Sequence, residues 1–331
     1  MRPRPASTAA KGMSDEEAEL PPANVAAIAR MLLPDFDAAM ARLKADAVAT
    51  LDKARDLLTV SQRDPAWFAA RRLRFTGSRF GTLAGNNPYS SPNSVYKDML
   101  WPRPSFTNAD MQVRDSCSPA PPCDPLMQRG IDLEPVCRDR YIAALPPGTR
   151  CDVPGLVVTT PDTDPDGIYR AFGYSPDGIL CLPDGTLELL EIKCPRGFYS
   201  NSTRGSCTVQ RIDEQGTVAI PHQYFDQIQG GAALLRQIHG EQHFGRLHFV
   251  QLVGDEMRSA VVAFDPEYAG RLMRGLAAQW EAQLLPRLLL QAAGHIRDGD
   301  VDPIVELDDG SGVRRDECGR VLHSMAKLPM R

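Results

Sequence analysis

The spacing of apolar residues along the chain predicts its helices and strands. Between Asn24 and Val60, apolar residues recur every three to four positions, which is typical of helices, and Pro34 divides this stretch into two. Further helices are predicted over 65–74, 127–145, 221–239 and 266–290. Apolar runs bounded by turn residues predict strands over 151–160, 171–182, 187–193, 247–253 and 259–264. This order indicates an α/β fold with a mixed central β-sheet flanked by helices and an added N-terminal helical region.

The same pattern divides the chain into four segments. Residues 1–22, rich in Ala, Pro and charge, are predicted to be a disordered leader, and residues 23–64 to be the N-terminal helical region. The core is predicted over 65–294, with a Pro-rich, loop-like insertion at about 86–125 and a polar loop at about 196–219. Residues 295–331 are predicted to be an irregular, charged tail.

Composition and charge narrow the class of protein. No run of about 18 apolar residues occurs, and Met1 to Pro22 lacks the apolar stretch of a secretory signal, so we expect an intracellular protein without a membrane span. The formal net charge is −5. A protein that coats nucleic acid by charge alone would be basic, so any such contact must be local, through a basic patch or bound divalent cations.

The eight cysteines do not follow the pattern of a small disulfide-bonded domain. In a long intracellular chain we expect reduced thiols. No pair of C-x-x-C motifs is present, so a zinc site is disfavoured.

The segment from Ser175 to Lys193 predicts a hairpin with an unusual end. Pro183-Asp184-Gly185 is strong turn chemistry between two apolar runs. A three-residue loop there sets the register of the strands. Leu182 then faces Thr186, Cys181 faces Leu187, Ile179 faces Leu189, and Asp177 faces Glu191.

This register places two carboxylates beside a lysine at the edge of a buried face. Like charges opposite each other on a sheet are destabilising, and desolvation adds several kcal/mol per ion. A hard divalent cation between Asp177 and Glu191 would remove the conflict, and Lys193 would then act on a water or on a phosphate. The alternative is a solvent-facing Glu–Lys pair, since E-x-K tripeptides are common.

The residues Ser-Pro-Asp177-Gly, followed by Leu-Glu191-Ile-Lys193-Cys-Pro, resemble the signature of the PD-(D/E)XK nuclease superfamily in its lambda-exonuclease/YqaJ form. Three further stretches match in the same order, so the resemblance covers about residues 65–255. It implies a restriction-endonuclease-like core.

The first of these stretches, from Trp67 to Ser78, resembles the family's W-x-x-x-R…T-A-S segment, with Gly77 where Ala is usual. The resemblance implies that Arg71 and Ser78 bind the terminal 5′-phosphate, with Arg72 and Arg74 as competitors. We also expect Ser78 to cap the following helix, whose N-terminus attracts phosphate. The alternative is a basic helix face followed by an ordinary cap.

The second stretch contains Gly130 and Glu134 and resembles a G-x-x-x-E helix whose glutamate joins the metal cluster. Glu134 has a simpler alternative as the i,i+4 partner of Arg138, and Asp132 is a nearby acid of the same charge. The family order favours Glu134.

The third stretch, Tyr224-Phe-Asp-Gln227-Ile-Gln229, resembles a Y-x-x-Q-x-Q helix. The resemblance implies that Gln227 bonds the attacking water. Tyr224 lies one turn away on the same face, whereas Gln229 points elsewhere and is predicted to be structural.

The cofactor implied by the resemblance is Mg²⁺, with Mn²⁺ able to replace it. Asp177, Glu191 and the carbonyl of Ile192 would hold one ion, and Asp177 and Glu134 a second. Related nucleases with an iron–sulfur cluster need several cysteines near the C-terminus, whereas only Cys318 lies beyond Cys207 here. That branch is disfavoured.

The activity implied is exonuclease digestion of one strand of linear duplex DNA, 5′→3′, in viral or phage-type recombination, replication or repair. The expected partners are double-stranded DNA ends and a single-strand annealing protein, in a bacterial cytoplasm or in the nucleus or cytoplasm of a virus-infected cell. The oligomeric state stays open, because some relatives form ring trimers and others act alone. The alternatives are an endonuclease of the same fold acting on DNA or RNA, and a catalytically inactive DNA-binding recombination scaffold.

Overall fold

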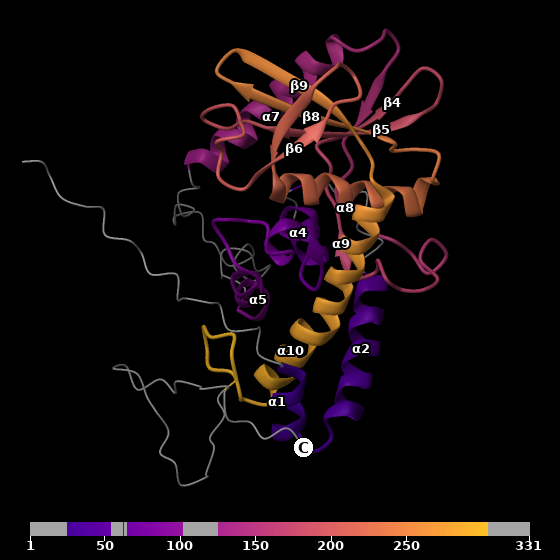
Figure 1. Cartoon of the computed structure of the whole chain (residues 1–331). Helices are drawn as coiled ribbons and strands as arrows, with labels where there is room; N and C mark the ends of the chain where they lie inside the picture. Colours follow the sequence, from indigo (N-terminus) through magenta and orange to yellow (C-terminus); the bar gives the residue numbers. More distant parts are fainter. Residues whose placement is uncertain (1–24, 54–61, 63–64, 102–124, 304–331) are drawn as a thin grey trace, which may run out of the picture.

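A computed structural model describes residues 25–53, 62, 65–101 and 125–303 and shows a mixed α/β fold (Figure 1). The central sheet has five strands in the order β2-β4-β5-β8-β9, and only β5 and β8 are parallel. Its strands are β2 (Arg150–Asp152), β4 (Gly178–Cys181), β5 (Leu187–Lys193), β8 (Arg246–Val253) and β9 (Glu256–Ala263). The predicted mixed sheet is confirmed.

The β4–β5 hairpin has the predicted register. Ile179 pairs with Leu189 and Cys181 with Leu187. The loop closes through hydrogen bonds from Leu182 N to Thr186 O and from Gly185 N to Leu182 O, both 2.9 Å. Gly185 has a φ of +84°, which a residue with a side chain rarely adopts. Residue 177, one position before β4, is therefore directed toward the end of β5.

Helices cover both faces of the sheet (Figure 1). Helix α7 (Pro125–Ala143) packs on one face, where Cys137 and Tyr141 contact Leu190 and Val250. Helix α8 (His222–His239) packs on the other face within the main core. That second face holds the side chains of Leu189, Glu191 and Lys193, because strand side chains alternate. Two elements therefore meet over these residues, the hairpin end and α8.

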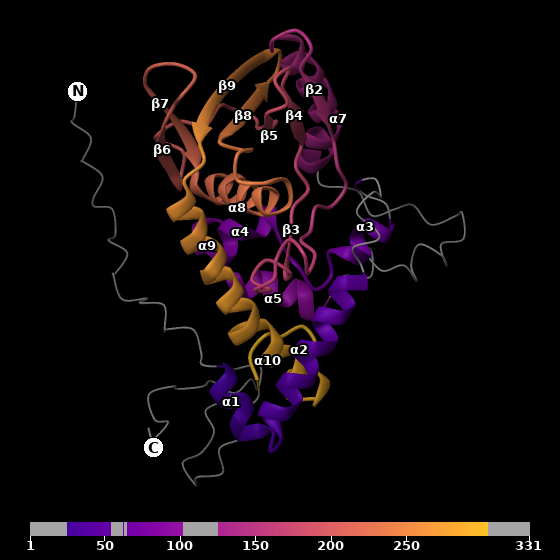
Figure 2. The same ribbon diagram turned by 90° about the vertical axis from the view of Figure 1, so that its right-hand side faces the viewer.

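The predicted pair of N-terminal helices is confirmed as α1 (Val25–Leu32) and α2 (Phe36–Lys53). They pack against a C-terminal helical segment, at the end of the molecule remote from the sheet (Figure 2). That segment is continuous through α9 (Pro266–Gln279), the π-helical turn η3 (Trp280–Leu284) and α10 (Leu285–Ala292).

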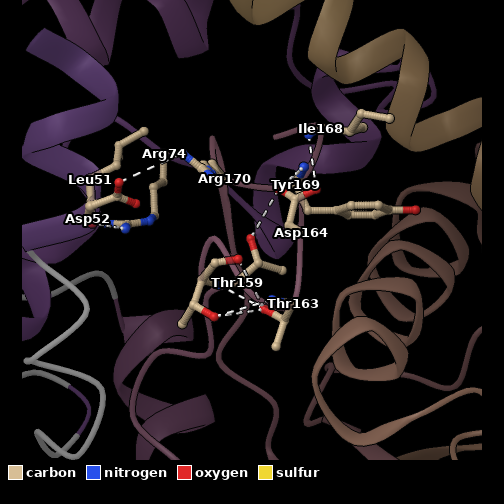
Figure 3. Close-up of polar contacts among 10 residues, drawn as sticks. Leu51, Asp52, Arg74, Thr159, Thr163, Asp164, Ile168, Tyr169 and Arg170 are labelled. Atoms are coloured by element: carbon tan, nitrogen blue, oxygen red, sulfur yellow. Dashed lines mark hydrogen bonds and ion pairs between the residues drawn. The ribbon is translucent and has the colours of Figure 1, made fainter. Parts of the chain in front are cut away.

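A buried arginine joins α2 to the core (Figure 3). Arg74, 2% exposed, donates to the carbonyl of Leu51 at 2.7 Å, and thus satisfies a carbonyl near the C-terminal end of α2. Arg170 lies 3.7 Å from Asp52 at the same junction. The loop that carries Arg170 is itself fixed by Asp164, which accepts hydrogen bonds from the backbone of Ile168 and Tyr169 (Figure 3).

Between α2 and the sheet lie three short helices and a small two-stranded sheet. These are α3 (Pro65–Ala70), α4 (Gly77–Leu83), α5 (Pro92–Leu100), and the parallel pair β1 (Phe75–Thr76) and β3 (Phe172–Gly173). Because Pro176 cannot donate to a ladder, the predicted strand 171–182 is divided into β3 and β4. The predicted strand 151–160 is shorter, ending at Asp152, with an isolated bridge at Val157.

Two predicted loops contain regular structure. The expectation of a loop-like segment over 86–125 was wrong for α5, which starts with Pro92 at its first turn and buries Val95 and Tyr96. The predicted polar loop at 196–219 contains a hairpin of β6 (Ser206–Gln210) and β7 (Thr217–Pro221). The rest of the Pro-rich insertion, 102–124, and the predicted leader and most of the tail lie outside the described residues.

Candidate active site

The hairpin end brings Asp177 to Glu191. Asp177 Oδ2 accepts a hydrogen bond of 2.6 Å from the backbone N–H of Ile192, on the strand opposite. Glu191 is fully buried on the neighbouring position of β5. The nearby charge of Glu191 contributes to a raised pKa of Asp177. The local turn chemistry of the hairpin therefore places the two acids side by side.

Three side chains donate to the Glu191 carboxylate. Lys193 Nζ lies 2.5 Å and Gln227 Nε2 2.6 Å from Oε1, and Tyr174 Oη lies 2.7 Å from Oε2. Burial, followed by the charge of Glu191, raises the pKa of Tyr174 well above its ordinary value, so the phenol keeps its proton and donates. Glu191 is thus held in one orientation by three donors from three separate segments.

Lys193 remains an ammonium in this environment. Burial alone would lower its pKa, but Glu191 and Asp177 outweigh burial and raise it above its ordinary value. Its Nζ also lies 4.7 Å from the ring centroid of Tyr224, one turn before Gln227 on α8. A lysine in this state supplies positive charge and hydrogen bonds.

The charges at this end of the hairpin do not balance. Asp177 and Glu191 share the single ammonium of Lys193, and burial together with Glu191 raises the pKa of Asp177 well above its ordinary value. A buried carboxylate in that position is stabilised either by a proton or by a cation. Carboxylate oxygens are the ligands that a hard divalent cation prefers, so the residues present fit such an ion.

Arg138 links Glu134 to Asp177 by donating hydrogen bonds to both residues. Arg138 donates to Glu134 Oε1 at 2.5 Å and to the backbone carbonyl of Asp177 at 2.7 Å. The i,i+4 pair considered as an alternative for Glu134 is therefore present, and the same arginine ties this acid to the site. Within the described ranges, however, no three His, Cys, Asp or Glu side chains are grouped closely enough to hold a metal ion. A role for Glu134 as a ligand stays a prediction.

The two glutamines of α8 have different surroundings. Gln227 donates to Glu191, as described above. Gln229 is buried, donates to the carbonyl of Ala263 and accepts from the backbone of Asp265, both at 2.9 Å. Gln229 thus links α8 to the start of α9, in agreement with the structural role predicted for it.

Arg71 is linked to the β4–β5 hairpin through Trp67. Its guanidinium stacks 4.0 Å from the ring centroid of Trp67, and the indole N–H of Trp67 lies 3.0 Å from Ser175 Oγ, two positions before Asp177. Burial, together with the charge of Arg79, lowers the pKa of Arg71 to about 10. The guanidinium is therefore charged at neutral pH but poorly solvated, which favours an anionic partner.

A cavity of about 780 Å³ adjoins Arg71. It lies between α2, α3, α4 and α5, and its polar lining is mostly basic. The arginines that line it are Arg71, Arg72, Arg74 and Arg79. Of the two predicted competitors of Arg71, Arg74 already donates to the carbonyls of Ala70 and Leu51, which disfavours it as a phosphate ligand.

The expectation that Ser78 caps the following helix was wrong. Thr76 occupies the N-cap position of α4, and its side chain makes no capping hydrogen bond. Ser78 is the second residue of the helix and is exposed. Thr76 pairs with Gly173 in the small parallel sheet, and this fixes the helix start at Gly77. A Cβ at Gly77 would meet the Tyr174 ring at 2.4 Å, so this position has no room for a side chain.

The sequence reasoning missed Tyr174 and Ser175. Tyr174 donates to Glu191, and Ser175 accepts from Trp67. Both immediately precede Pro176-Asp177, and a polar pair next to a predicted ligand was the one available signal for them.

A mixed sheet with helices on both faces, and an Asp…Glu-x-Lys set at the end of one hairpin, is the arrangement of a nuclease core of the PD-(D/E)XK class. A family model described as the YqaJ-like viral recombinase domain matches residues 66–234. The match covers half of the chain, and the chain therefore belongs to this family of nucleases, which are lambda-exonuclease-like members of that superfamily.

A comparison with curated proteins finds no match. In the part of the chain that the structure describes, no helix is both long and apolar enough to cross a membrane.

Proposed function

We propose that the protein is a Mg²⁺-dependent exonuclease that digests one strand of linear duplex DNA in the 5′→3′ direction during viral or phage-type recombination. The observation that supports this activity is the pair of half-buried Asp177 and fully buried Glu191, with Lys193 bonded to Glu191. Family membership supports a recombination nuclease with DNA as its substrate.

Different side chains of the site have different roles in the hydrolysis of the phosphodiester. Water attacks phosphorus and loses a proton to the solvent. The P–O bond to the leaving nucleotide breaks on the opposite side, and the leaving oxygen takes up a proton from the solvent. Lys193, as an ammonium, stabilises the negative charge that grows on the phosphate oxygens. Gln227, fixed through its N–H₂ group to Glu191, offers its carbonyl oxygen to the attacking water.

The ligand set proposed for Mg²⁺, or Mn²⁺ in its place, consists of Asp177, Glu191 and the carbonyl of Ile192, with Asp177 and Glu134 for a second ion. When bound, the ions would supply Lewis-acid stabilisation of the attacking and leaving oxygens. Tyr174 keeps Glu191 oriented toward this position through the hydrogen bond to its other oxygen.

The proposed direction of digestion rests on Arg71 and the basic cavity beside it. Arg71 is a poorly solvated guanidinium stacked on Trp67, which bonds Ser175, and the polar lining of the adjacent cavity is mostly basic. A terminal 5′-phosphate bound by Arg71, with Ser78 on the adjacent helix, would place the first internucleotide bond near Asp177. We propose Ser78 as a direct ligand from the exposed first turn of α4, not as a helix cap.

The experiment that tests this function uses linear duplexes labelled at either end, with and without a 5′-phosphate. Each duplex is incubated with the protein in about 10 mM Mg²⁺ or, as the metal-free control, in EDTA. We expect release of nucleotides from the 5′ end only, faster with the phosphate, and none in EDTA. Release from the 3′ end contradicts the polarity. Cleavage of closed circular DNA or of RNA identifies an endonuclease, and binding without cleavage identifies an inactive scaffold.

The product of this reaction is a 3′ single strand. A protein that coats or anneals single strands is the partner proposed for it, and pull-down of such a protein on partly digested duplex tests this.

A further inference from the structure

Tyr89 is the most exposed of the large hydrophobic side chains in the described ranges, at 69%. Its ring does not lie alone, because the guanidinium of Arg204 is 5.8 Å from its centroid. An exposed aromatic ring beside an arginine offers one flat apolar face and one positive charge. These are the two features by which proteins hold an unpaired base and its phosphate.

The loop that carries Tyr89 is held in place. The backbone N–H of Tyr89 donates to Asn87 Oδ1 at 3.0 Å, and Asn87 Nδ2 donates to Thr82 at the end of α4. The side chain of Asn86 donates at 2.9 Å to Asp226, the buried neighbour of Gln227 on α8. The exposed ring is thus presented by a fixed turn that is anchored to the helix of the active site.

The segment that carries Arg204 is anchored to the active site at its other end. The Tyr199 ring packs 5.7 Å from that of Tyr224, whose own face receives the Lys193 ammonium. Arg204 is five positions after Tyr199, so their Cα atoms are at most roughly 18 Å apart.

The two segments are locked against each other where they meet. Gly205 has a φ of +72°, and a Cβ placed on it would lie 2.9 Å from the Pro88 ring. The carbonyl of Gly205 accepts from the backbone of His222 at the start of α8, at 2.7 Å. The relative positions of Tyr89 and Arg204 are therefore set by the contact between their neighbours Pro88 and Gly205.

Charge along these segments favours nucleic acid. Although the whole chain has a net charge of −5, residues 65–97 and 192–212 contain no Asp or Glu. The basic residues in these two ranges are Arg71, Arg72, Arg74, Arg79, Lys97, Lys193, Arg196, Arg204 and Arg211. Arg196 and Arg204 are exposed along the segment that leads from the site to Tyr89. The two ranges meet at the contact between Pro88 and Gly205, where Arg204 adds an exposed positive charge. Arg211, by contrast, is paired with Asp213 and Glu214.

We infer that Tyr89 and Arg204 form a stacking platform for an unpaired base of the DNA strand, outside the carboxylate cluster that would cut it. The inference rests on the proposed function, which supplies DNA as the substrate. It goes beyond that function by assigning a base-binding position outside the carboxylate cluster and outside the 5′-phosphate pocket.

The test is position-specific fluorescence in EDTA, where no strand is cut. A set of 5′-phosphorylated duplexes with a short frayed end carries one 2-aminopurine at successive positions of the unpaired strand. With the wild-type protein we expect quenching at one or two adjacent positions. Tyr89→Ala should abolish that quenching and raise the Kd for the duplex about tenfold, which corresponds to about 1.4 kcal/mol of binding free energy.

Matched variants separate stacking from other effects. Tyr89→Phe keeps an aromatic ring and should keep both the quenching and the Kd, whereas Tyr89→Leu should lose them. Arg204→Gln should weaken the Kd and reduce its dependence on salt. Met31→Ala, at another exposed apolar side chain on α1, 56% exposed, is the control that should change neither.

Each outcome decides one of the two proposals. Quenching that persists in Tyr89→Ala, or the absence of any position-dependent quenching in the wild type, overturns the platform even if the protein digests DNA with Mg²⁺. Quenching that depends on Tyr89, in a protein that releases no nucleotides with Mg²⁺, supports the platform and overturns the proposed exonuclease.

Discussion

Strand β5 carries two buried glutamates on opposite faces of the sheet, and their surroundings differ in charge. Glu188, 2% exposed, faces α7 and contacts Arg246 at 2.9 Å and the imidazole of His248. His248 in turn is hydrogen-bonded to Tyr141, at 2.7 Å. The Glu188 carboxylate therefore contacts one permanent cation, Arg246, through one oxygen and one imidazole, His248, through the other.

Glu191 faces α8, three positions further along the same strand, and shares Lys193 with Asp177. Here two acids meet one cation. The comparison shows that burial of an acid does not by itself indicate chemistry. An acid whose charge is balanced by its neighbours contributes to the fold, whereas a pair with an excess of negative charge fits a cation or a proton from outside.

The largest expected effect is the loss of activity in Asp177→Asn, which keeps the shape of the side chain and removes its charge. We expect nuclease activity to fall by about 100- to 1000-fold. Thermal stability without metal should be equal or higher, because the charge imbalance is relieved. Mg²⁺ should raise the melting temperature of the wild type and not that of the variant. An active variant, or an equal Mg²⁺ shift in both proteins, contradicts the assignment of the site.

The next effect concerns the balanced acid. Glu188→Ala should lower the free energy of unfolding by about 3 kcal/mol, because it leaves His248 and Arg246 without their acceptor. Activity per folded molecule should be kept. Urea unfolding measures the first and nucleotide release the second. The control is Glu256→Ala, an exposed glutamate paired with Arg258, for which about 0–1 kcal/mol is expected. A loss of activity without a loss of stability in Glu188→Ala would remove the distinction between the two faces.

The two glutamines of α8 extend the comparison to side chains without charge. Gln227→Ala should reduce kcat about tenfold or more with little change in stability, because Gln227 bonds Glu191. Gln229→Ala should leave kcat unchanged and lower the free energy of unfolding by about 1 kcal/mol, since it removes two part-buried hydrogen bonds to the backbone of Ala263 and Asp265. Steady-state kinetics and urea unfolding on both variants test the pair, and equal effects on kcat would contradict it.

The smallest effect is a pH dependence at Asp226. Burial raises the pKa of this aspartate above its ordinary value of 3.8, despite hydrogen bonds from Tyr268 and Asn86. The folded protein therefore holds this proton more tightly than the unfolded chain does. The stabilisation is present at low pH and is lost as the pH rises from the ordinary value through the raised one.

Asp226→Asn removes this titration. The free energy of unfolding of the wild type, taken relative to the variant, should fall between about pH 4 and the raised pKa and stay level above it. Urea unfolding of both proteins over this range measures the difference. A difference that rises with pH would reverse the sign and show that Asp226 is better stabilised as an anion.

The sequence predicted those features whose causes are local. The bounds of β5 and the register of its hairpin follow from an apolar run and from Pro183-Asp184-Gly185, all within one short segment. Helices α1 and α2 were separated correctly because Pro34 acts on its immediate neighbours. The candidate cluster of Asp177, Glu191 and Lys193 depends on the same hairpin and was predictable for the same reason.

Features that depend on distant parts of the chain were not predictable in this way. Thr76 ends its strand against Gly173, and the start of α4 follows from that pairing and not from Ser78. Tyr174 reaches Glu191 from a separate segment, and no periodicity marks it. The β6–β7 hairpin was missed because exposed polar residues such as Thr208 and Gln210 interrupt its few apolar positions. Its apolar face, formed by Val209, Val218 and Ile220, is recognisable only from its packing against the core.

The contact of Arg74 with α2 limits how the protein can be shortened. The guanidinium is enclosed by the core, yet one of its acceptors, the Leu51 carbonyl, belongs to the N-terminal helices. A truncated protein that starts at the family match would keep this arginine and lose that acceptor. The helices before residue 54 therefore supply one of the acceptors of this buried arginine, and crystallisation or expression trials should retain them.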